Sequence, residues 1–206
     1  MATLNDCKLV KNISKKYFDR LEIELEIDDN QKSRLGFYPF ILSCITEITD
    51  IDELKELIID TEFRKKIFKQ GNNDLGIDAY FIDEDKKQIY LFNFKYRTKE
   101  FNSDSSQEIN MLNDSSKFIN AIYAENTQNT DDTTGKVLKK IIDKQNSIDL
   151  WRITLFLVSN ENNKLDINRN EVVSFAKQYD IEIVPIALDE IVEFISDSPE
   201  EKKPLL

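Results

Sequence analysis

The run from Trp151 to Val158 constrains the fold most, because it is almost entirely apolar over the length of one strand. A short, nearly continuous apolar run indicates a strand buried on both faces of a sheet. A helical pattern over about 168–179 follows it, and then a second strand-like run from Ile181 to Ile186. A strand, a helix and a strand of these lengths form a crossover unit, which predicts two parallel strands in an α/β fold.

The rest of the chain is mostly helical in pattern, with one β-hairpin. Two β-type runs, 77–82 and 89–96, are separated by a polar turn and predict the hairpin. One helix is expected to start near Gly36, with Pro39 in its first turn. Helical patterns cover about 12–25, 37–48, 52–67, 105–125, 134–147, 168–179 and 188–195. This order predicts a mixed central sheet flanked by helices, in which an antiparallel hairpin joins parallel strands. We expect a single domain over 1–206, with its core at about 12–196.

The register of the hairpin decides which polar side chains meet. If Asp83 faces Gln88 across the turn, the pairing continues to Asp78 opposite Asn93. Opposed side chains share a face of the sheet, and Lys95 lies on that face as well, since side chains alternate along a strand. The sequence therefore predicts that Asp78, Asn93 and Lys95 project together, whereas a slip of one residue would separate them.

The absence of histidine excludes several classes of catalytic site. Ser-His and Cys-His nucleophiles, His-ligated zinc and histidine acid–base catalysis all need an imidazole. The two cysteines, Cys7 and Cys44, fit no metal-ligand spacing and are expected to be reduced, which indicates a cytoplasmic protein. Chemistry in this chain must therefore use carboxylates, lysine, hydroxyls or a hard metal ion.

The net charge of −11 limits how the chain can bind nucleic acid. An acidic average surface repels phosphate at long range, so a nucleic-acid role needs a local basic patch or a partner protein. No apolar run reaches the roughly 18 residues that a membrane span requires, and the N-terminus lacks the apolar segment of a signal peptide. We therefore expect no membrane contact.

The expected cluster at the hairpin contains the groups of a hydrolytic metal site. Asp78, an oxygen of Asn93 and the backbone carbonyl of Phe94 would hold Mg²⁺ or Mn²⁺, which prefer oxygen ligands. The Lys95 ammonium would stabilise charge on a phosphate or help to deprotonate a metal-bound water. The alternative is an ordinary ion pair at the end of a strand.

Two segments of this region resemble the core motif of PD-(D/E)XK nucleases. They are Gly71-Asn72-Asn73-Asp74-Leu75-Gly76-Ile77-Asp78-Ala79 and Ile89-Tyr90-Leu91-Phe92-Asn93-Phe94-Lys95-Tyr96-Arg97. More narrowly, they are similar to the N-terminal region of the abortive-infection phage-resistance (AIPR) family, which has a similar G-x-x-D-x-G-I-D-A stretch before a hairpin. The resemblance spans about 12–196, but only 71–97 is specific. It implies a restriction-endonuclease-like fold in antiphage defence, with Asp78 binding the metal and Lys95 as the catalytic lysine.

Asn93 departs from the family pattern. It occupies the position at which the resembled proteins have an acidic residue or glutamine. The neutral asparagine oxygen binds a metal more weakly than a carboxylate does. Three explanations stay open: an active asparagine variant, a naturally inactive homologue, or an engineered substitution.

Further candidates surround the motif. Glu47 is our candidate for the additional acid that some relatives of this fold supply from an upstream helix, and the alternative is a solvated residue at a helix end. Asp74 is predicted to be a turn residue rather than a ligand, because it follows Gly-Asn-Asn. Tyr96, Arg97 and Lys99 are candidate contacts to DNA or RNA, although Tyr96 also suits the edge of a core.

Three functions are compatible with these features. The first is a metal-dependent endonuclease domain acting on DNA or RNA in antiphage defence. The second is a catalytically inactive domain of the same fold that binds nucleic acid or a protein partner, which Asn93 and the net charge favour. The third is an acidic inhibitor of a nucleic-acid-binding protein, which predicts a continuous acidic face and no cavity at Asp78.

The length of the whole protein is also open at this stage. The resembled proteins continue well past the last expected helix, whereas this chain ends at Leu206. The chain is then either a full domain or the N-terminal part of a longer protein, whose activity would depend on a C-terminal continuation or on a partner protein.

Overall fold

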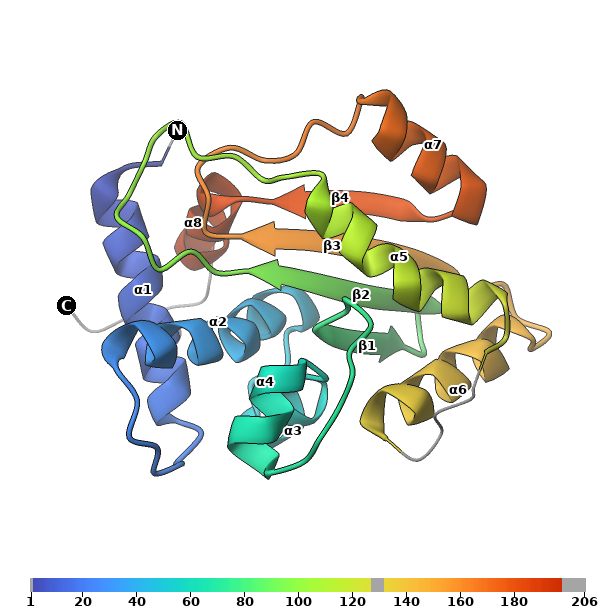
Figure 1. The fold of residues 1–206 in the computed structure, drawn as a ribbon, viewed down its shortest axis with the longest axis horizontal. Helices are drawn as coiled ribbons and strands as arrows, with labels where there is room; N and C mark the ends of the chain where they lie inside the picture. The colour runs from blue at the N-terminus through green and yellow to red at the C-terminus, as the bar shows by residue number, and fades with distance from the viewer. Residues whose placement is uncertain (1, 127–131, 198–206) are drawn as a thin grey trace.

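The computed structural model describes residues 2–126 and 132–197. It contains one four-stranded mixed sheet, in the order β1-β2-β3-β4 (Figure 1), formed by β1 (Ala79–Asp83), β2 (Gln88–Lys95), β3 (Arg152–Ser159) and β4 (Glu182–Ile186). β1 is antiparallel to β2, and the other neighbours are parallel. The predicted α/β fold is therefore confirmed. The prediction of one domain over 1–206 includes residues outside the described ranges and stays a prediction.

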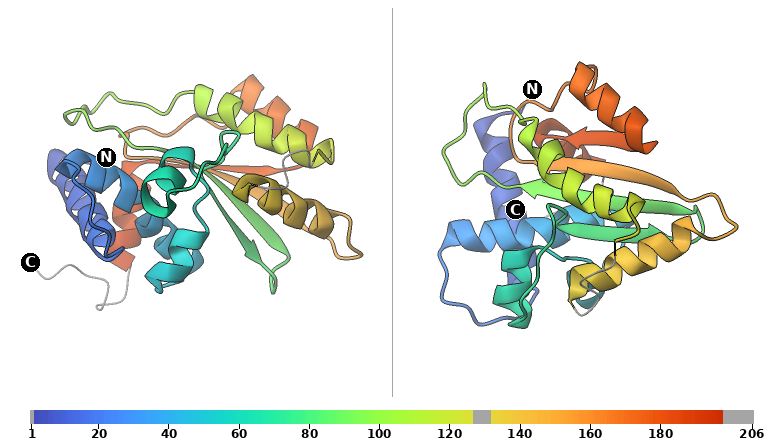
Figure 2. Two further views of the ribbon diagram at one scale, coloured as in Figure 1. Left: turned by 60° about the horizontal axis from the view of Figure 1, so that its bottom comes forward. Right: turned by 45° about the vertical axis from the view of Figure 1, so that its right-hand side comes forward.

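Helices cover both faces of the sheet. They are α1 (Leu4–Asp19), α2 (Asp29–Thr46), α3 (Ile51–Glu56), α4 (Thr61–Phe63) with the π-helical turn η1 (Arg64–Phe68), α5 (Asn110–Tyr123), α6 (Thr133–Gln145), α7 (Asn170–Tyr179) and α8 (Leu188–Asp197). Leu91 of β2 packs into the core that α5, α6 and α7 form with one face, and Phe92 into the core formed by α1, α2 and α8 with the other. Figure 2 shows these layers from two further sides. Within the described ranges, no helix is both long and apolar enough to cross a membrane.

The hairpin has the predicted register. Asp83 pairs with Gln88, and the ladder continues to Ala79 opposite Phe92. Asp78 directly precedes β1, and its N–H donates to the Phe92 carbonyl at 2.8 Å. Asp78 therefore lies across from Asn93 at the open end of the hairpin.

The first two helices begin earlier than predicted. α1 starts after Thr3, whose side chain forms a capping box with Asp6. α2 starts after Asp28, whose carboxylate accepts a hydrogen bond from the Gln31 N–H at 2.8 Å. Both starts were missed because a polar first turn carries little of the apolar periodicity on which the prediction depended.

Gly36 does not start a helix but lies within α2, where α2 packs against α1. A Cβ at Gly36 would lie 1.8 Å from the backbone oxygen of Ser14, so only glycine permits the two helices to approach this closely. The placement of Pro39 in a first turn is consequently wrong, because Pro39 also lies inside α2.

Candidate metal centre

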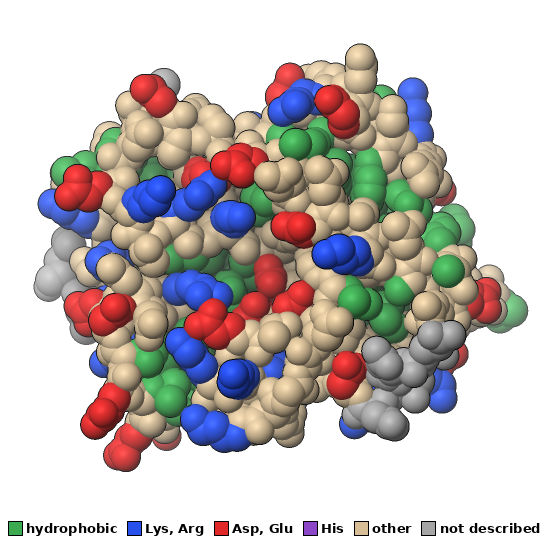
Figure 3. Space-filling view, in the orientation of Figure 1, with side chains coloured by type: hydrophobic (Ala, Val, Ile, Leu, Met, Phe, Trp, Pro, Cys, Tyr) green, Lys and Arg blue, Asp and Glu red, His purple; other side chains and the backbone are tan. Residues whose placement is uncertain are grey.

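A cavity of about 430 Å³ lies at the open end of the hairpin, beside α5. Asp78, Asn93 and Lys95 all line it, together with Asp74 and Lys117. The structure thus brings the three residues of the predicted cluster to one cavity. On this side of the molecule, acidic side chains gather in a central hollow and Lys and Arg side chains surround it (Figure 3).

Three carboxylates meet beside this cavity, and two of them, Asp74 and Asp78, line it. Asp60, Asp74 and Asp78 each offer one oxygen, and these oxygens lie within 4.8 Å of one another. Asp60 is buried, whereas Asp74 and Asp78 are half-buried. Mg²⁺ and Mn²⁺ prefer oxygen ligands of this kind, so we name Asp60, Asp74 and Asp78 the carboxylate cluster and treat it as the candidate metal site.

Asp78 is fixed by backbone groups on two sides. Its Oδ2 accepts a hydrogen bond from the Phe94 N–H at 2.5 Å. Its carbonyl oxygen accepts from the N–H groups of Ile59 at 2.8 Å and Asp60 at 2.9 Å. Phe94 therefore contacts the Asp78 carboxylate through its backbone N–H. That the Phe94 carbonyl binds a metal stays a prediction.

The other two carboxylates are oriented by local turns. Asp60 caps α4 and accepts a hydrogen bond from the Phe63 N–H at 2.6 Å. Asp74 accepts from the N–H and the hydroxyl of Thr61, at 2.9 and 2.7 Å, and from the Gly76 N–H at 2.8 Å. Asp74 is thus a turn residue, as predicted, and the prediction that it would not also lie at the metal site is not supported.

Asp60 is the member of the cluster that the sequence did not indicate. Its only local signal is an aspartate at the start of a short helix, which is common without any metal. Its position depends on pairing between the segment before α4 and the start of β1. The Tyr80 N–H donates to the Leu57 carbonyl at 3.1 Å, and Ile58 forms an antiparallel bridge with Ala79.

The carboxylates disfavour each other's ionisation. Burial raises the pKa of Asp78 well above its ordinary value, and the charge of Asp60 raises it further, against the hydrogen bond from Phe94. Burial also raises the pKa of Asp60, against its hydrogen bond from Phe63 and together with the charge of Asp74. The cluster therefore favours a bound proton, and a divalent cation would remove the same repulsion.

Two residues of α2 lie beside the cluster. Arg34 forms an ion pair with Glu62 at 2.6 Å and a hydrogen bond with the Tyr38 hydroxyl. Burial raises the pKa of Tyr38 well above its ordinary value, and the charges of Asp60 and Asp78 add to the shift. A guanidinium has only donors, so the Tyr38 oxygen accepts from Arg34 and its own proton stays available to an acceptor.

The surroundings of Asn93 explain why an amide stands at this position. Its Nδ2 has two hydrogens and lies within hydrogen-bond distance of three acceptors, the carbonyl oxygens of Gly76 at 3.0 Å and Met111 at 3.1 Å and the Ser115 hydroxyl at 3.0 Å. A carboxylate here would direct negative oxygens at two carbonyl groups. Asn93 therefore joins the turn before β1 to α5, and only its amide oxygen could serve as a ligand.

Lys95 provides a positive charge at the same cavity. It is the last residue of β2 and is half-buried. Among the described residues, its ammonium forms neither a hydrogen bond nor an ion pair. The ammonium is thus free to contact an anionic ligand.

Glu47 lies elsewhere. α2 ends at Thr46, and Glu47 follows in a left-handed conformation with φ of 62°. It lines a separate cavity with Asp83 and Lys86 of the hairpin turn, at the far end of β1 from Asp78. The structure does not support Glu47 as the additional acidic ligand, and Asp60 is the acid that it brings to the cluster instead.

The candidate nucleic-acid contacts have different environments. The Tyr96 ring packs 5.1 Å from the Phe37 ring, and burial raises the pKa of Tyr96 to about 12, so it belongs to the core. Arg97 forms ion pairs with Glu161 at 2.9 Å and Glu108 at 3.1 Å, and part of its side chain remains exposed. Lys99 lines a second cavity together with Arg97.

Comparisons of the chain with protein-family models, with curated proteins and with solved structures found no match. The resemblance to PD-(D/E)XK nucleases and to the AIPR family thus stays a prediction from residues 71–97. The function has to be argued from the cavity, the carboxylate cluster and Lys95.

Proposed function

We propose that the chain is a metal-dependent phosphodiester hydrolase that acts on DNA or RNA. The observation that carries the proposal is the carboxylate cluster, whose oxygens lie within 4.8 Å of one another at a cavity that Lys95 also lines. Mg²⁺ or Mn²⁺ bound there would polarise a phosphate and activate a water molecule. With no histidine in the chain, this is the hydrolytic chemistry that its residues support best.

The residues of the chain have separate tasks in this proposal. Asp60, Asp74 and Asp78 hold the cation, and the Phe94 N–H keeps the Asp78 carboxylate in place. The Lys95 ammonium contacts a non-bridging phosphate oxygen and stabilises the charge that develops during hydrolysis.

Two features of the sequence bear on the biological setting of the protein. A role in antiphage defence rests on the resemblance of residues 71–97 alone. We place the protein in the cytoplasm because its two cysteines, Cys7 and Cys44, are not joined by a disulfide, which suits a reducing compartment. A C-terminal continuation or a partner protein would add to the substrate contacts.

Asn93 favours a second candidate, a catalytically inactive domain that binds nucleic acid or a protein. Its amide nitrogen is used for structure, and no carboxylate stands at its position. The third function, an acidic inhibitor, predicted no cavity at Asp78, and the cavity there argues against it.

A cleavage assay tests the proposal. Plasmid DNA, single-stranded DNA and RNA are incubated with Mg²⁺ or Mn²⁺ and with the wild-type chain, Asp78→Asn, Lys95→Ala or the control Asp143→Asn, which changes an exposed aspartate of α6. We expect cleavage by the wild type and the control, and rates at least about a hundredfold lower for the other two. The absence of cleavage in the wild type, or equal rates in Asp78→Asn, would favour the inactive binding domain.

A further inference from the structure

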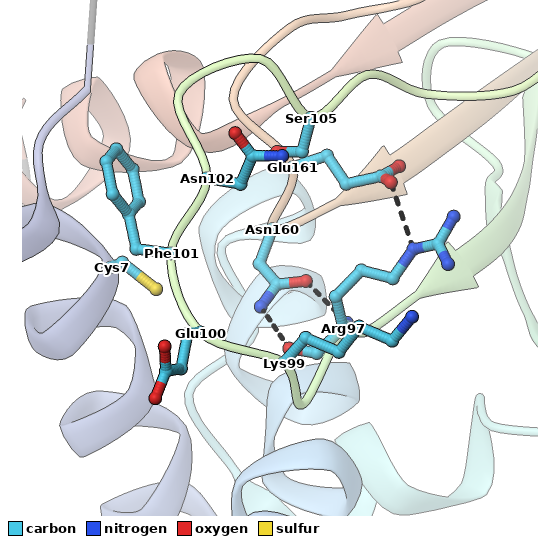
Figure 4. A pocket seen from close by; sticks show the side chains of 9 residues that line it. All are labelled: Cys7, Arg97, Lys99, Glu100, Phe101, Asn102, Ser105, Asn160 and Glu161. Atoms are coloured by element: carbon cyan, nitrogen blue, oxygen red, sulfur yellow. Dashed lines mark hydrogen bonds and ion pairs between the residues drawn. The ribbon is translucent and has the colours of Figure 1, made fainter.

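A second cavity, of about 160 Å³, lies between α1 and the chain segments that follow β2 and β3 (Figure 4). Phe101 and Cys7 line one side of it, and Arg97 and Lys99 extend on the other (Figure 4). Asn160 also lines it. The volume has room for one small planar group and is too small for a base pair.

The two cavities are adjacent along the chain. Lys95 lines the first, and Arg97 and Lys99 line the second. Arg97 is fixed beside β3, because its N–H donates to Asn160 Oδ1 at 2.7 Å and its carbonyl accepts from Asn160 Nδ2 at 2.9 Å. The three cations therefore follow one another along the chain, from the cavity at the carboxylate cluster to the second cavity.

Glu161 lines the second cavity with its carboxylate directed toward Arg97 (Figure 4), and one of its oxygens lacks a donor within the described ranges. Glu161 is only 4% exposed, and its Oε1 accepts from Arg97 Nε at 2.9 Å. Its Oε2 is buried and has no hydrogen-bond partner among the described residues. An unpaired buried acceptor is costly, so a ligand with N–H donors beside Glu161 would be favoured.

We propose that the second cavity binds one unstacked nucleobase, and hence that the substrate is single-stranded nucleic acid. This inference rests on the proposed function. Phe101 stacks on the base, as aromatic side chains do in single-strand-binding proteins. Arg97 and Lys99 contact the phosphates that lead to Lys95, and the amino group of a base donates toward Glu161.

Two further considerations favour a single strand over a duplex. A base in a duplex has to be flipped out of the stack before it can enter such a cavity, which costs free energy, whereas a single strand offers its bases at once. A duplex also has a denser phosphate charge than a single strand, so a chain with a net charge of −11 repels it more strongly.

Fluorescence anisotropy with labelled oligonucleotides in EDTA, which prevents cleavage, tests the inference. We expect single strands to bind at least about tenfold more tightly than a duplex of the same sequence. Moving one abasic nucleotide along the strand should reveal one position at which affinity falls about tenfold. A DNA series and an RNA series then determine which sugar is accepted.

Phe101 variants connect this result to the cavity. Phe101→Ala should abolish the position dependence of the abasic scan, and Phe101→Tyr should retain it. Tyr123→Ala, which removes a half-exposed aromatic ring at the end of α5, should behave like the wild type. Thermal unfolding of each variant verifies that it folds.

The outcomes separate the two proposals. Equal affinity for single strands and duplex, or an abasic scan without a sensitive position, would overturn the inference and leave the metal-dependent cleavage standing. A chain that neither binds nor cleaves any nucleic acid would overturn the proposed function itself.

Discussion

Asp78 combines two opposing features. It is pressed against Asp60 and Asp74, which penalise its negative charge, and it accepts a hydrogen bond from the Phe94 N–H, which favours that charge. Repulsion of this kind is common where a site is built to receive a cation or to transfer a proton. The stability of the protein should therefore depend on pH and on divalent cations.

We expect the contribution of Asp78 and Asp60 to the free energy of unfolding in EDTA to fall as pH rises above about 4. The folded pKa values of Asp78 and Asp60 lie above their unfolded values, so the folded state binds more protons between the two. Stability is thus fully present below the unfolded pKa and is lost as pH rises through the folded pKa. Urea unfolding at several pH values measures this slope, which Asp78→Asn should reduce and Asp143→Asn should not. Equal slopes in all three proteins would contradict the account.

Replacement of Asn93 by aspartate should destabilise the protein rather than complete the site. An aspartate side chain has no N–H, so the Gly76 and Met111 carbonyls would lose the donor that Asn93 provides. We expect this loss to lower the free energy of unfolding by about 2 kcal/mol. The same measurement on Asn168→Asp, which changes an exposed residue, provides the control. An Asn93→Asp protein as stable as the wild type would show that the amide is not required.

The sequence could indicate some residues of the site but not others. Asp78 and Lys95 could be predicted because the register of one local hairpin sets their positions relative to each other. Asp60 was not, because it joins the cluster through pairing between segments that are distant in sequence. Tyr38 and Arg34 were missed for the same reason, since nothing in α2 itself shows which element it packs against.

At the scale of the elements, the predictions that the structure confirms are those that depend on residues close together in the sequence. The hairpin register followed from its turn and from the alternation of side chains, and the structure confirms it. The start of α2 was misplaced because its first turns are polar, so the helix was expected to start only near Gly36. The role of Gly36 is a close contact with α1, which depends on the packing of two helices and leaves no local pattern.

Gly76 makes a comparable contact at the site. It has φ of 84°, and a Cβ there would lie 2.2 Å from the backbone oxygen of Asp114 in α5. Gly76→Ala should therefore lower the free energy of unfolding by more than about 2 kcal/mol. Gly71→Ala is a matched control, because nothing lies within 4 Å of its added Cβ and it should change stability little. Similar unfolding curves for the two variants would contradict this view of the turn.

At the scale of the whole molecule, the fold class followed from the order of the elements, whereas the charge distribution did not. The net charge of −11 suggested a chain that repels nucleic acid. The structure places Lys95 beside the first cavity and Arg97 and Lys99 beside the second, so these cations can offset the negative net charge at those positions. No sequence average can show such an arrangement.

A small number of phosphate contacts should give a shallow salt dependence. Each contact to a single strand contributes about −0.7 to the slope of log affinity against log salt concentration, so three contacts predict about −2. Lys99→Gln should reduce that slope by one contact, and Lys139→Gln, on the exposed face of α6, should leave it unchanged. Anisotropy titrations at several NaCl concentrations measure the slope, and a slope unaffected by Lys99→Gln would exclude this residue from the interface.

The binding of Mn²⁺ to the full chain, followed by electron paramagnetic resonance, tests most directly whether the carboxylate cluster holds a cation. The account predicts that Mn²⁺ binds at this site and binds more tightly as pH rises, because the metal displaces a proton. Asp78→Asn should weaken the binding at least about tenfold, and Asp143→Asn should not change it. Absence of Mn²⁺ binding in the wild type, or equal affinity in Asp78→Asn, would contradict the central claim.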